Sequence, residues 1–190
     1  MEARALLQAL HVAERLKDET RHCYTSKGRH ESVAEHSWRM ALMAMWVADE
    51  FPQLDMNRVI RMCLSHDLGE CFTGDIPTFL KTGADEENEA GQLDAWVSSL
   101  PQPTSDEMRE LYAEMDAQQT MEAKVYKSLD KLEAVIQHNE SPLDTWAENE
   151  YALNRTYAVD FVRFSDYLSA LREEIRKDTE EKIAAGKQTV

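Results

Sequence analysis

The segment Ser65–Glu70 reads SHDLGE and places an imidazole, two carboxylates and a glycine directly behind the largely apolar run Val59–Leu64. Charged side chains are costly in a protein core unless another group compensates them. The segment is therefore either a polar helix end in water or one wall of a metal site.

Two more residues of ligand type stand where a core helix should be apolar. His36 comes early in a segment rich in Met and Ala, and Asp130 interrupts a stripe of Val and Leu. Together with the adjacent pair His66 and Asp67, they offer two imidazoles and two carboxylates from three separate segments. Such a set can bind one divalent transition metal ion and leave coordination positions open for water or substrate.

Each of these residues also has an ordinary structural interpretation. A single histidine on a helix is usually a surface residue or a satisfied core residue. Asp130 could simply pair with Lys127 or Lys131, which are close to it in sequence. The combination of an adjacent His-Asp pair, an upstream histidine and a downstream aspartate in an apolar stripe favours the metal site.

Helices must position these residues, because apolar residues recur at helical spacing along almost the whole chain and sustained alternation is missing. The length of 190 residues fits one domain. We therefore predict a single-domain, all-α bundle over residues 1–190. The predicted helices cover about 2–18, 33–50, 55–68, 85–100, 104–140 with an interruption near 118–119, 143–154 and 158–184, and loops cover 19–31 and 71–79.

Local signals indicate where several helices begin. Ser32 and Glu35 fit a capping box, in which a serine side chain and a glutamate three residues later satisfy free amide groups. Thr104 and Glu107 fit a second one, and Asp55 is the predicted N-cap of the helix over 55–68. The buried stripe of the first helix is predicted to be Leu6, Leu7, Leu10, Ala13 and Leu16.

Composition excludes several function classes. The net charge of −15, from 36 acidic against 21 basic residues, repels phosphate backbones and argues against binding to a nucleic acid polymer. We find neither an apolar run long enough to cross a bilayer nor a signal peptide, and we expect a cytoplasmic protein without a membrane partner. The three cysteines lack the spacing of a disulfide framework or a structural zinc site.

The four ligand-type residues resemble the H…HD…D signature of the HD phosphohydrolase superfamily, whose all-α fold holds a divalent metal with the side chains matched by His36, His66, Asp67 and Asp130. The resemblance extends over about residues 5–140, the core of the domain, which the C-terminal helices over 141–184 complete. Three stretches are similar to the HD-domain 5′-deoxynucleotidase family: RHESVAEHSWRMALMA (29–44), SHDLGECFTGDIP (65–77) and EAKVYKSLDKLEAVIQ (122–137).

This resemblance implies a phosphomonoesterase that hydrolyses (deoxy)nucleoside 5′-monophosphates to nucleoside and phosphate by attack of a metal-activated water. It also implies that Glu70 and Asp75 carry the acid–base work, with Glu70 in proton transfer and Asp75 orienting the nucleophile. The two roles could be exchanged. Read without the resemblance, Glu70 is equally a solvated helix-end acid and Asp75 a turn former.

Phosphate binding requires a cation besides the metal, and a guanidinium can bind two phosphate oxygens. Arg21 and Arg29 lie in the predicted loop before His36, and Arg21 matches the phosphate-binding arginine of the resembled family. His22 stands where bacterial members have a tryptophan near the sugar, so the preference for deoxyribose over ribose stays open. Lys124 shares a helical face with Asp130 and could line the site or pair with an acid.

The resemblance also bears on the number of metal ions. Dinuclear enzymes of this fold need extra histidines between the positions of His66 and Asp130, and this chain has none in that interval. We therefore expect one divalent ion, which could be Co²⁺, Mn²⁺, Mg²⁺ or Zn²⁺.

Three alternatives stay open at this point. One is an HD hydrolase of nucleoside triphosphates or guanosine polyphosphates, and another is a non-catalytic, nucleotide-binding HD module. The third is an acidic helical bundle without metal. Members of the resembled family are commonly dimeric, so we expect a homodimer, and we interpret Phe161, Phe164 and Tyr167 as core or subunit contact rather than a ligand site. We expect the last few residues to fray.

Overall fold

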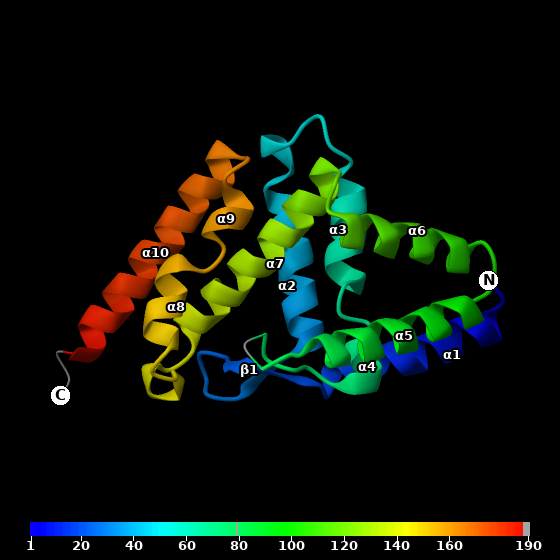
Figure 1. Ribbon diagram of the computed structural model, residues 1–190, viewed down its shortest axis with the longest axis horizontal. Helices are drawn as coiled ribbons and strands as arrows, with labels where there is room; N and C mark the ends of the chain where they lie inside the picture. Colours follow the sequence, from blue (N-terminus) through cyan, green and yellow to red (C-terminus); the bar gives the residue numbers. More distant parts are fainter. Residues whose placement is uncertain (79, 188–190) are drawn as a thin grey trace.

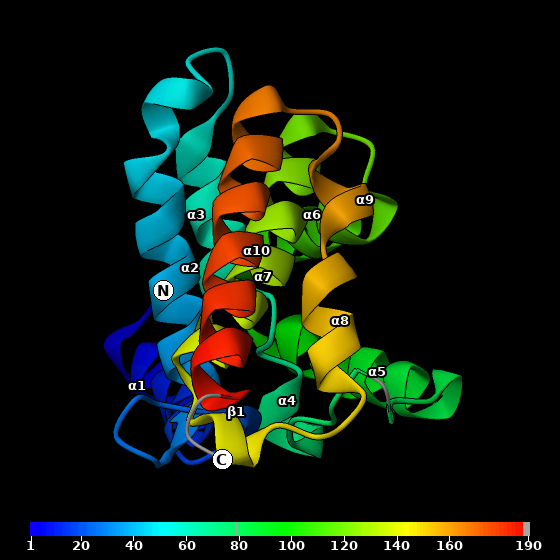
Figure 2. The same cartoon turned by 90° about the vertical axis from the view of Figure 1, so that its left-hand side faces the viewer.

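Helix α7 (Met121–Glu140) is the central element, and it contacts α2, α3, α6, α9, α10 and the first strand. The computed structural model describes residues 1–78 and 80–187 (Figures 1 and 2). The predicted fraying of the last residues concerns 188–190, which lie outside the described residues. Residue 79, the last of the predicted loop 71–79, also lies outside them. The other helices are α1 (Ala3–Ala13), α2 (Val33–Trp46), α3 (Met56–Ser65), α4 (Glu70–Thr73), α5 (Gly83–Ser99), α6 (Thr104–Ala117), α8 (Glu150–Thr156), α9 (Val159–Val162) and α10 (Asp166–Lys187), with 3₁₀ helices at Glu14–Lys17, Ala48–Glu50 and Leu143–Thr145.

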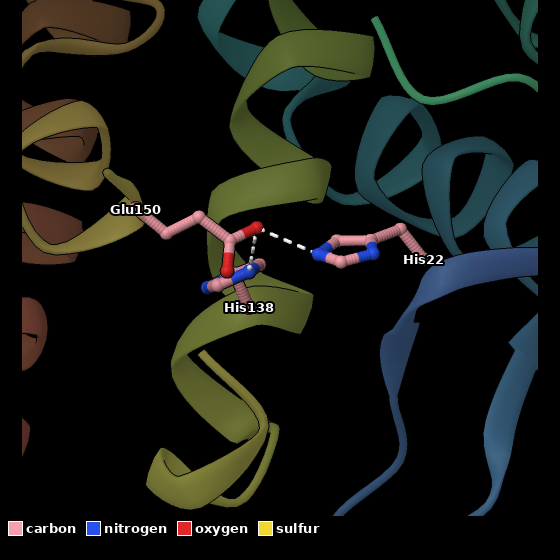
Figure 3. Close-up of side chains that lie close together, drawn as sticks. All are labelled: His22, His138 and Glu150. Atoms are coloured by element: carbon pink, nitrogen blue, oxygen red, sulfur yellow. Dashed lines mark hydrogen bonds and ion pairs between the residues drawn. The ribbon is translucent and has the colours of Figure 1, made fainter. Parts of the chain in front are cut away.

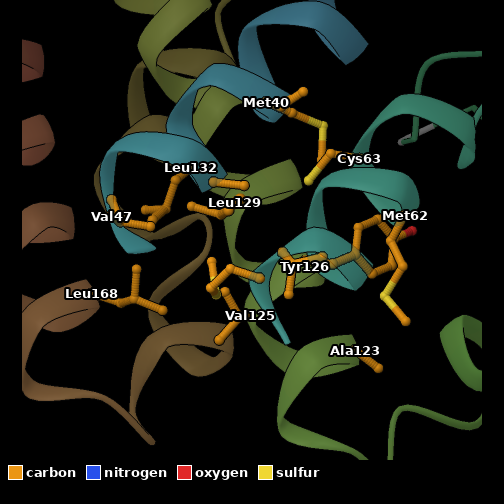
Figure 4. Close-up of a cluster of buried hydrophobic side chains, with 14 of the residues drawn as sticks. Met40, Val47, Met62, Cys63, Ala123, Val125, Tyr126, Leu129, Leu132 and Leu168 are labelled. Atoms are coloured by element: carbon orange, nitrogen blue, oxygen red, sulfur yellow. The ribbon is translucent and has the colours of Figure 1, made fainter. Parts of the chain in front are cut away.

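The predicted all-α class is confirmed, and the core lies where α2, α3, α7 and α10 meet. Figure 4 shows apolar side chains from these helices packed together. Helices α5 and α6 form a hairpin that extends away from this centre in Figure 1. Among the described residues, no helix is both long enough and apolar enough to span a bilayer. The largest fully buried side chains of the core include Met40, Met62, Leu129, Leu132 and Leu168.

Helix starts follow the predicted capping signals with one exception. The Ser32 hydroxyl accepts a hydrogen bond from the Glu35 amide at 3.3 Å, and the Glu35 carboxylate accepts one from the Ser32 amide at 2.9 Å, so this capping box is confirmed. Asp55 caps α3 as predicted. The second predicted capping box is wrong, because Pro103 is the N-cap of α6 and Thr104 is already helical. The carbonyls of Pro101 and Pro103 accept the first amide hydrogen bonds there.

The predicted loop over 19–31 is an antiparallel hairpin of β1 (Thr20–Tyr24) and β2 (His30–Ser32). The alternation typical of a strand is hidden in the sequence because a buried position carries a charge: Glu31 is 2 % exposed. Side chains of α7 and its C-cap hold the hairpin, since Gln137 Nε2 donates to the Tyr24 carbonyl and Ser141 Oγ accepts from the Tyr24 amide. The hairpin therefore lies directly beside the helix that carries Asp130.

Several other predicted boundaries and faces are wrong. Helix α1 ends at Ala13, and its Leu6, Leu7 and Leu10 are 45–52 % exposed instead of buried. The predicted loop over 71–79 begins with the short helix α4, and the predicted helix over 143–154 is a 3₁₀ turn followed by α8. The predicted last helix is divided into α9 and α10, because Ser165 caps the amide of Leu168. Phe161, Phe164 and Tyr167 are 37–44 % exposed, which excludes the core interpretation, whereas their interpretation as subunit contact stays a prediction.

Candidate functional site

The structure brings His36, His66, Asp67 and Asp130 together from three helices. His36 lies in the first turns of α2, His66 is the C-cap of α3 with Asp67 next to it, and Asp130 lies in the middle of α7. His36 Nε2 is 3.5 Å from Asp130 Oδ1 and 3.9 Å from Asp67 Oδ2. His66 Nε2 is 2.9 Å from Asp67 Oδ2 and 4.0 Å from Asp130 Oδ1.

The unsatisfied atoms of this cluster fit a divalent cation. The Nε2 atoms of His36 and His66 are buried and make no well-directed hydrogen bond, although each lies within 4.0 Å of both carboxylates. The Nδ1 atoms are occupied, because that of His36 bonds to Glu133 and that of His66 lies 3.0 Å from the Cys63 carbonyl. A histidine held at Nδ1 presents Nε2 as a metal ligand. The ligand atoms of His36, His66 and Asp67 lie within 4.8 Å of one another.

Glu133 positions His36, and the sequence analysis missed it. Its carboxylate is fully buried, accepts from His36 Nδ1, and accepts from Arg39 Nε at 2.6 Å. Burial opposes ionisation, but the charges of His36, Arg21 and Arg39 lower the pKa of Glu133 to about 2. Burial and Arg21 oppose protonation of His36, but Glu133 and Asp130 raise the pKa of His36 to about 9. In the metal-free protein, these acids therefore favour the protonated imidazole of His36, and a bound cation would take the place of the proton on Nε2.

The second oxygen of Asp130 is neutralised by two ammonium groups. Lys127 Nζ lies 2.9 Å and Lys131 Nζ 3.2 Å from Asp130 Oδ2, which leaves Oδ1 for the two histidines. Burial would raise the pKa of Asp130, but Lys131, Lys127 and His36 lower it well below its usual range. The pairing considered as an alternative in the sequence thus coexists with the cluster.

A cavity of about 280 Å³ opens over this cluster and follows α7. Asp130 and His138 both line it, and they lie about two helical turns, or about 12 Å, apart along α7. One end of the cavity therefore contains Asp67 and Asp130, and the other contains His138 with Glu150 from α8.

Glu70 and Asp75 line the cavity close to the ligand cluster. Glu70 is 6 % exposed, and its Oε2 has no hydrogen-bond partner. Burial, together with the charges of Asp67, Asp75 and Glu89, raises the pKa of Glu70 to about 10, so this carboxyl carries a proton at neutral pH in the metal-free protein. Burial also raises the pKa of Asp75. Gly74, with φ of +77°, makes the turn that brings Asp75 to the cavity.

Two of the four candidate substrate-binding residues line the cavity. Arg21 does so beside Asp67, with its Nη1 4.0 Å from Asp67 Oδ2, and Glu31 orients it through a 3.1 Å ion pair with Nε. His22 lines the cavity from the next position of β1.

The structure does not bring Arg29 or Lys124 to this cavity, as far as its described lining extends. Arg29 is exposed and bonds to both carboxylate oxygens of Glu35. The cationic side chains found at the cavity instead are Lys81, Lys127 and Lys131. The sequence pattern contained a signal for the last two, because each is within one helical turn of Asp130.

Comparisons with known proteins identify the family of this chain. Residues 13–172 match the family described as HD domain, and the chain belongs to this family. The 5′-deoxynucleotidase HDDC2 of Homo sapiens is 36 % identical over 142 residues, which cover 73 % of this chain and 69 % of that protein. The resemblance inferred from the sequence motifs is thereby confirmed.

Solved structures have the same fold. A protein of Magnetospirillum magnetotacticum, described as a "predicted metal-dependent phosphohydrolase", superposes with a TM-score of 0.77 at 26 % identity, covering 94 % of this chain and 95 % of that chain. The HD phosphohydrolase DatZ of cyanophage S-2L, bound to dA and one catalytic Zn²⁺ ion, has a TM-score of 0.58 at 22 % identity, covering 92 % and 96 %. Because DatZ is only 22 % identical, its similarity to this chain shows a shared fold and nothing further.

Proposed function

We propose that this HD-domain protein is a metal-dependent phosphomonoesterase that hydrolyses (deoxy)nucleoside 5′-monophosphates to nucleoside and phosphate. The observation that carries the proposal is the pair of buried Nε2 atoms of His36 and His66, which make no well-directed hydrogen bond and lie within 4.0 Å of the carboxylates of Asp67 and Asp130. The relatives named 5′-deoxynucleotidase support the substrate class.

His36, His66, Asp67 and Asp130 would hold one divalent cation, and their two imidazoles favour Zn²⁺, Co²⁺ or Mn²⁺ over Mg²⁺. When bound there, the cation supplies Lewis-acid chemistry, because it lowers the pKa of water and withdraws charge from phosphoryl oxygens. Glu133 keeps His36 oriented through its Nδ1 atom.

The other cavity residues divide the work on the phosphate. Arg21 is oriented by Glu31 and binds the phosphate oxygens. Asp75 orients the attacking water and accepts its proton as the new bond to phosphorus forms. Glu70, which is buried and lines the cavity close to Asp67, donates a proton to the 5′ oxygen as the bond from phosphorus to that oxygen breaks. The nucleoside would occupy the end of the cavity away from Asp67 and Asp130, where His22 lies beside Glu150.

A monophosphate suits the charge of the cavity better than a polyphosphate. Each cation that lines the described part of the cavity is already paired with an acid: Arg21 with Glu31, Lys81 with Glu89, and Lys127 and Lys131 with Asp130. A triphosphate or guanosine polyphosphate would need more unpaired positive charge.

Phosphate release from deoxy- and ribonucleoside monophosphates, measured with each of Co²⁺, Mn²⁺, Zn²⁺ and Mg²⁺, tests the proposal. Wild type should release orthophosphate, Asp67→Ala should not, and the matched surface variant Asp49→Ala should behave as wild type. Release of pyrophosphate or triphosphate from larger nucleotides would favour the polyphosphate alternative. Nucleotide binding without hydrolysis under any metal would favour the non-catalytic module.

We also propose that the chain is one domain that acts as a homodimer in the cytoplasm. The single domain is supported by α7, which contacts helices from both halves of the chain. The cytoplasm is supported by three buried cysteines, all free thiols. Exposed Trp38, Met45 and Trp46 of α2 offer apolar surface to a second copy. Light scattering of the purified protein gives the mass of the assembly.

A further inference from the structure

A second group of metal-ligand side chains lies at the far end of the cavity, away from the cluster around Asp130. Figure 3 shows His22, His138 and Glu150 converging from three different elements. His22 comes from β1, His138 from the last turn of α7, and Glu150 is the first residue of α8. We propose that these three side chains bind a divalent transition metal ion of the zinc type, separate from the ion of the proposed active site.

One carboxylate oxygen is shared by the two imidazoles. Glu150 Oε1 lies 2.7 Å from His22 Nε2 and 3.0 Å from His138 Nε2. All three ligand atoms lie within 4.8 Å of one another. Two imidazole nitrogens and one carboxylate oxygen are the protein ligands of open zinc sites, in which the fourth position is left to water or a ligand.

Neighbouring groups restrict the orientation of Glu150 and His138. Glu150 is 3 % exposed, and its other oxygen accepts a hydrogen bond from the Ala147 amide at 2.5 Å, so Oε1 is the oxygen presented to the histidines. His138 is fixed by Asn154, whose Nδ2 lies 2.7 Å from its Nδ1, and by the Trp146 ring, whose centroid is 4.6 Å away. Such outer contacts orient metal-bound histidines.

Only a small adjustment would admit an ion. Tetrahedral zinc with bonds of about 2.0–2.1 Å separates its ligand atoms by about 3.3 Å. The two nitrogen–oxygen distances would therefore open by roughly half an ångström. The Asn154 amide would turn so that its oxygen accepts from His138 Nδ1, which frees Nε2 for the metal. His22, whose side chain is 35 % exposed, leaves the fourth position open toward the cavity.

The bound ion would offset the charge of Glu150, which is buried against two imidazoles. It would also lie about two turns of α7 away from Asp130, at the end of the cavity that the proposed function gives to the nucleoside. Binding there does not depend on hydrolysis, so the two proposals can fail separately.

Zinc stoichiometry of the full chain, measured by elemental analysis after equilibration with Zn²⁺ and removal of loosely bound ion, tests the proposal without turnover. Wild type should retain two equivalents, whereas Glu150→Gln and His22→Gln should each retain one. Asp67→Asn should keep the ion at the second site. His11→Gln, which changes an exposed histidine of α1, is the matched control and should retain two.

Two further measurements keep the result interpretable. Circular dichroism shows whether each variant is folded, and His22→Gln on the hairpin is the informative variant if Glu150→Gln does not fold. Asn154→Ala should weaken zinc binding at this site about 10–100-fold. Zinc retention by folded Glu150→Gln and His22→Gln that equals the retention of wild type would overturn the proposal and leave a hydrogen-bonded network without a metal.

Discussion

Replacing Glu133 by glutamine tests whether a single buried carboxylate sets the geometry of the proposed metal site. Glu133 accepts hydrogen bonds from two donors, His36 Nδ1 and Arg39 Nε. A glutamine retains one acceptor oxygen and presents an amide N–H₂ group to the other donor. Since a hydrogen bond to a charged group contributes about 1.5–3 kcal/mol, we expect the metal-free Glu133→Gln protein to lose about 2–3 kcal/mol of unfolding free energy.

For a chain of this length, that loss corresponds to a fall in Tm of about 4–12 °C. We also expect metal affinity, measured by competition with a chromophoric chelator, to fall about 10–100-fold because His36 is no longer held at Nδ1. Glu140→Gln is the matched control, since Glu140 pairs with the same Arg39 at 2.6 Å but is about half exposed. It should cost less than about 1 kcal/mol.

The pH dependence of the metal-free protein gives an independent check. The pKa of Glu133 is lowered from 4.5 to about 2, so its contribution to stability is complete above pH 4.5 and is lost as the pH falls toward 2. The pKa of His36 is raised from 6.5 to about 9, so its contribution is complete below pH 6.5 and is lost as the pH rises through 9. The stability difference between wild type and Glu133→Gln should therefore be largest between pH 4.5 and 6.5. A Glu133→Gln protein as stable and as tight for metal as Glu140→Gln would refute this reasoning.

Three other variants probe the cavity and its surroundings. Arg21→Ala should lower kcat/KM for a nucleoside monophosphate at least about tenfold in steady-state kinetics, because a charged hydrogen bond to phosphate is removed. An unchanged kcat/KM would mean that Arg21 only supports the hairpin. Arg29→Ala should leave kcat/KM unchanged and change stability only slightly in a urea titration, since its ion pair with Glu35 is exposed. The hydrogen bond from Arg29 lowers the pKa of Glu35 to about 2, so that small difference should disappear as the pH falls from 4.5 toward 2. Gly74→Ala should destabilise the fold by about 1 kcal/mol or more, because Gly74 has a positive φ. It should also lower kcat by displacing Asp75. A variant with the kcat and Tm of wild type would contradict this prediction.

The cluster residues could be found from the sequence because a polar residue in an apolar helical stripe stands out. The same criterion would have found Glu133, which stands between Leu132 and Val135 in the stripe that contains Asp130. Glu133 was not predicted because it acts through His36 and is not itself one of the four proposed metal ligands. His138 and Glu150 carry no such signal, since their proximity depends on how α8 returns beside the end of α7.

The errors in the predicted fold have a common physical origin. A sequence pattern shows that a helix or strand is amphipathic, but it does not show which element packs against its apolar face. The stripe of α1 is amphipathic, yet Leu6, Leu7 and Leu10 remain largely exposed on the described chain. The hairpin shows the opposite case, a charged residue at a buried position. Glu31 is buried with its ion pair to Arg21, so β2 lacks the alternation of apolar and polar residues that indicates a strand. Tertiary contacts decide both outcomes.

The position of α7 restricts how the length of this protein can vary. Inserting or deleting one residue between Asp130 and Glu133 would rotate all later side chains by about 100° and shift them by about 1.5 Å along the helix. Glu133, Gln137 and His138 would then lose their contacts with α2, the hairpin and α8 together. Natural length differences among relatives should therefore concentrate in the connecting turns, such as the one at Pro101–Pro103, and spare this helix.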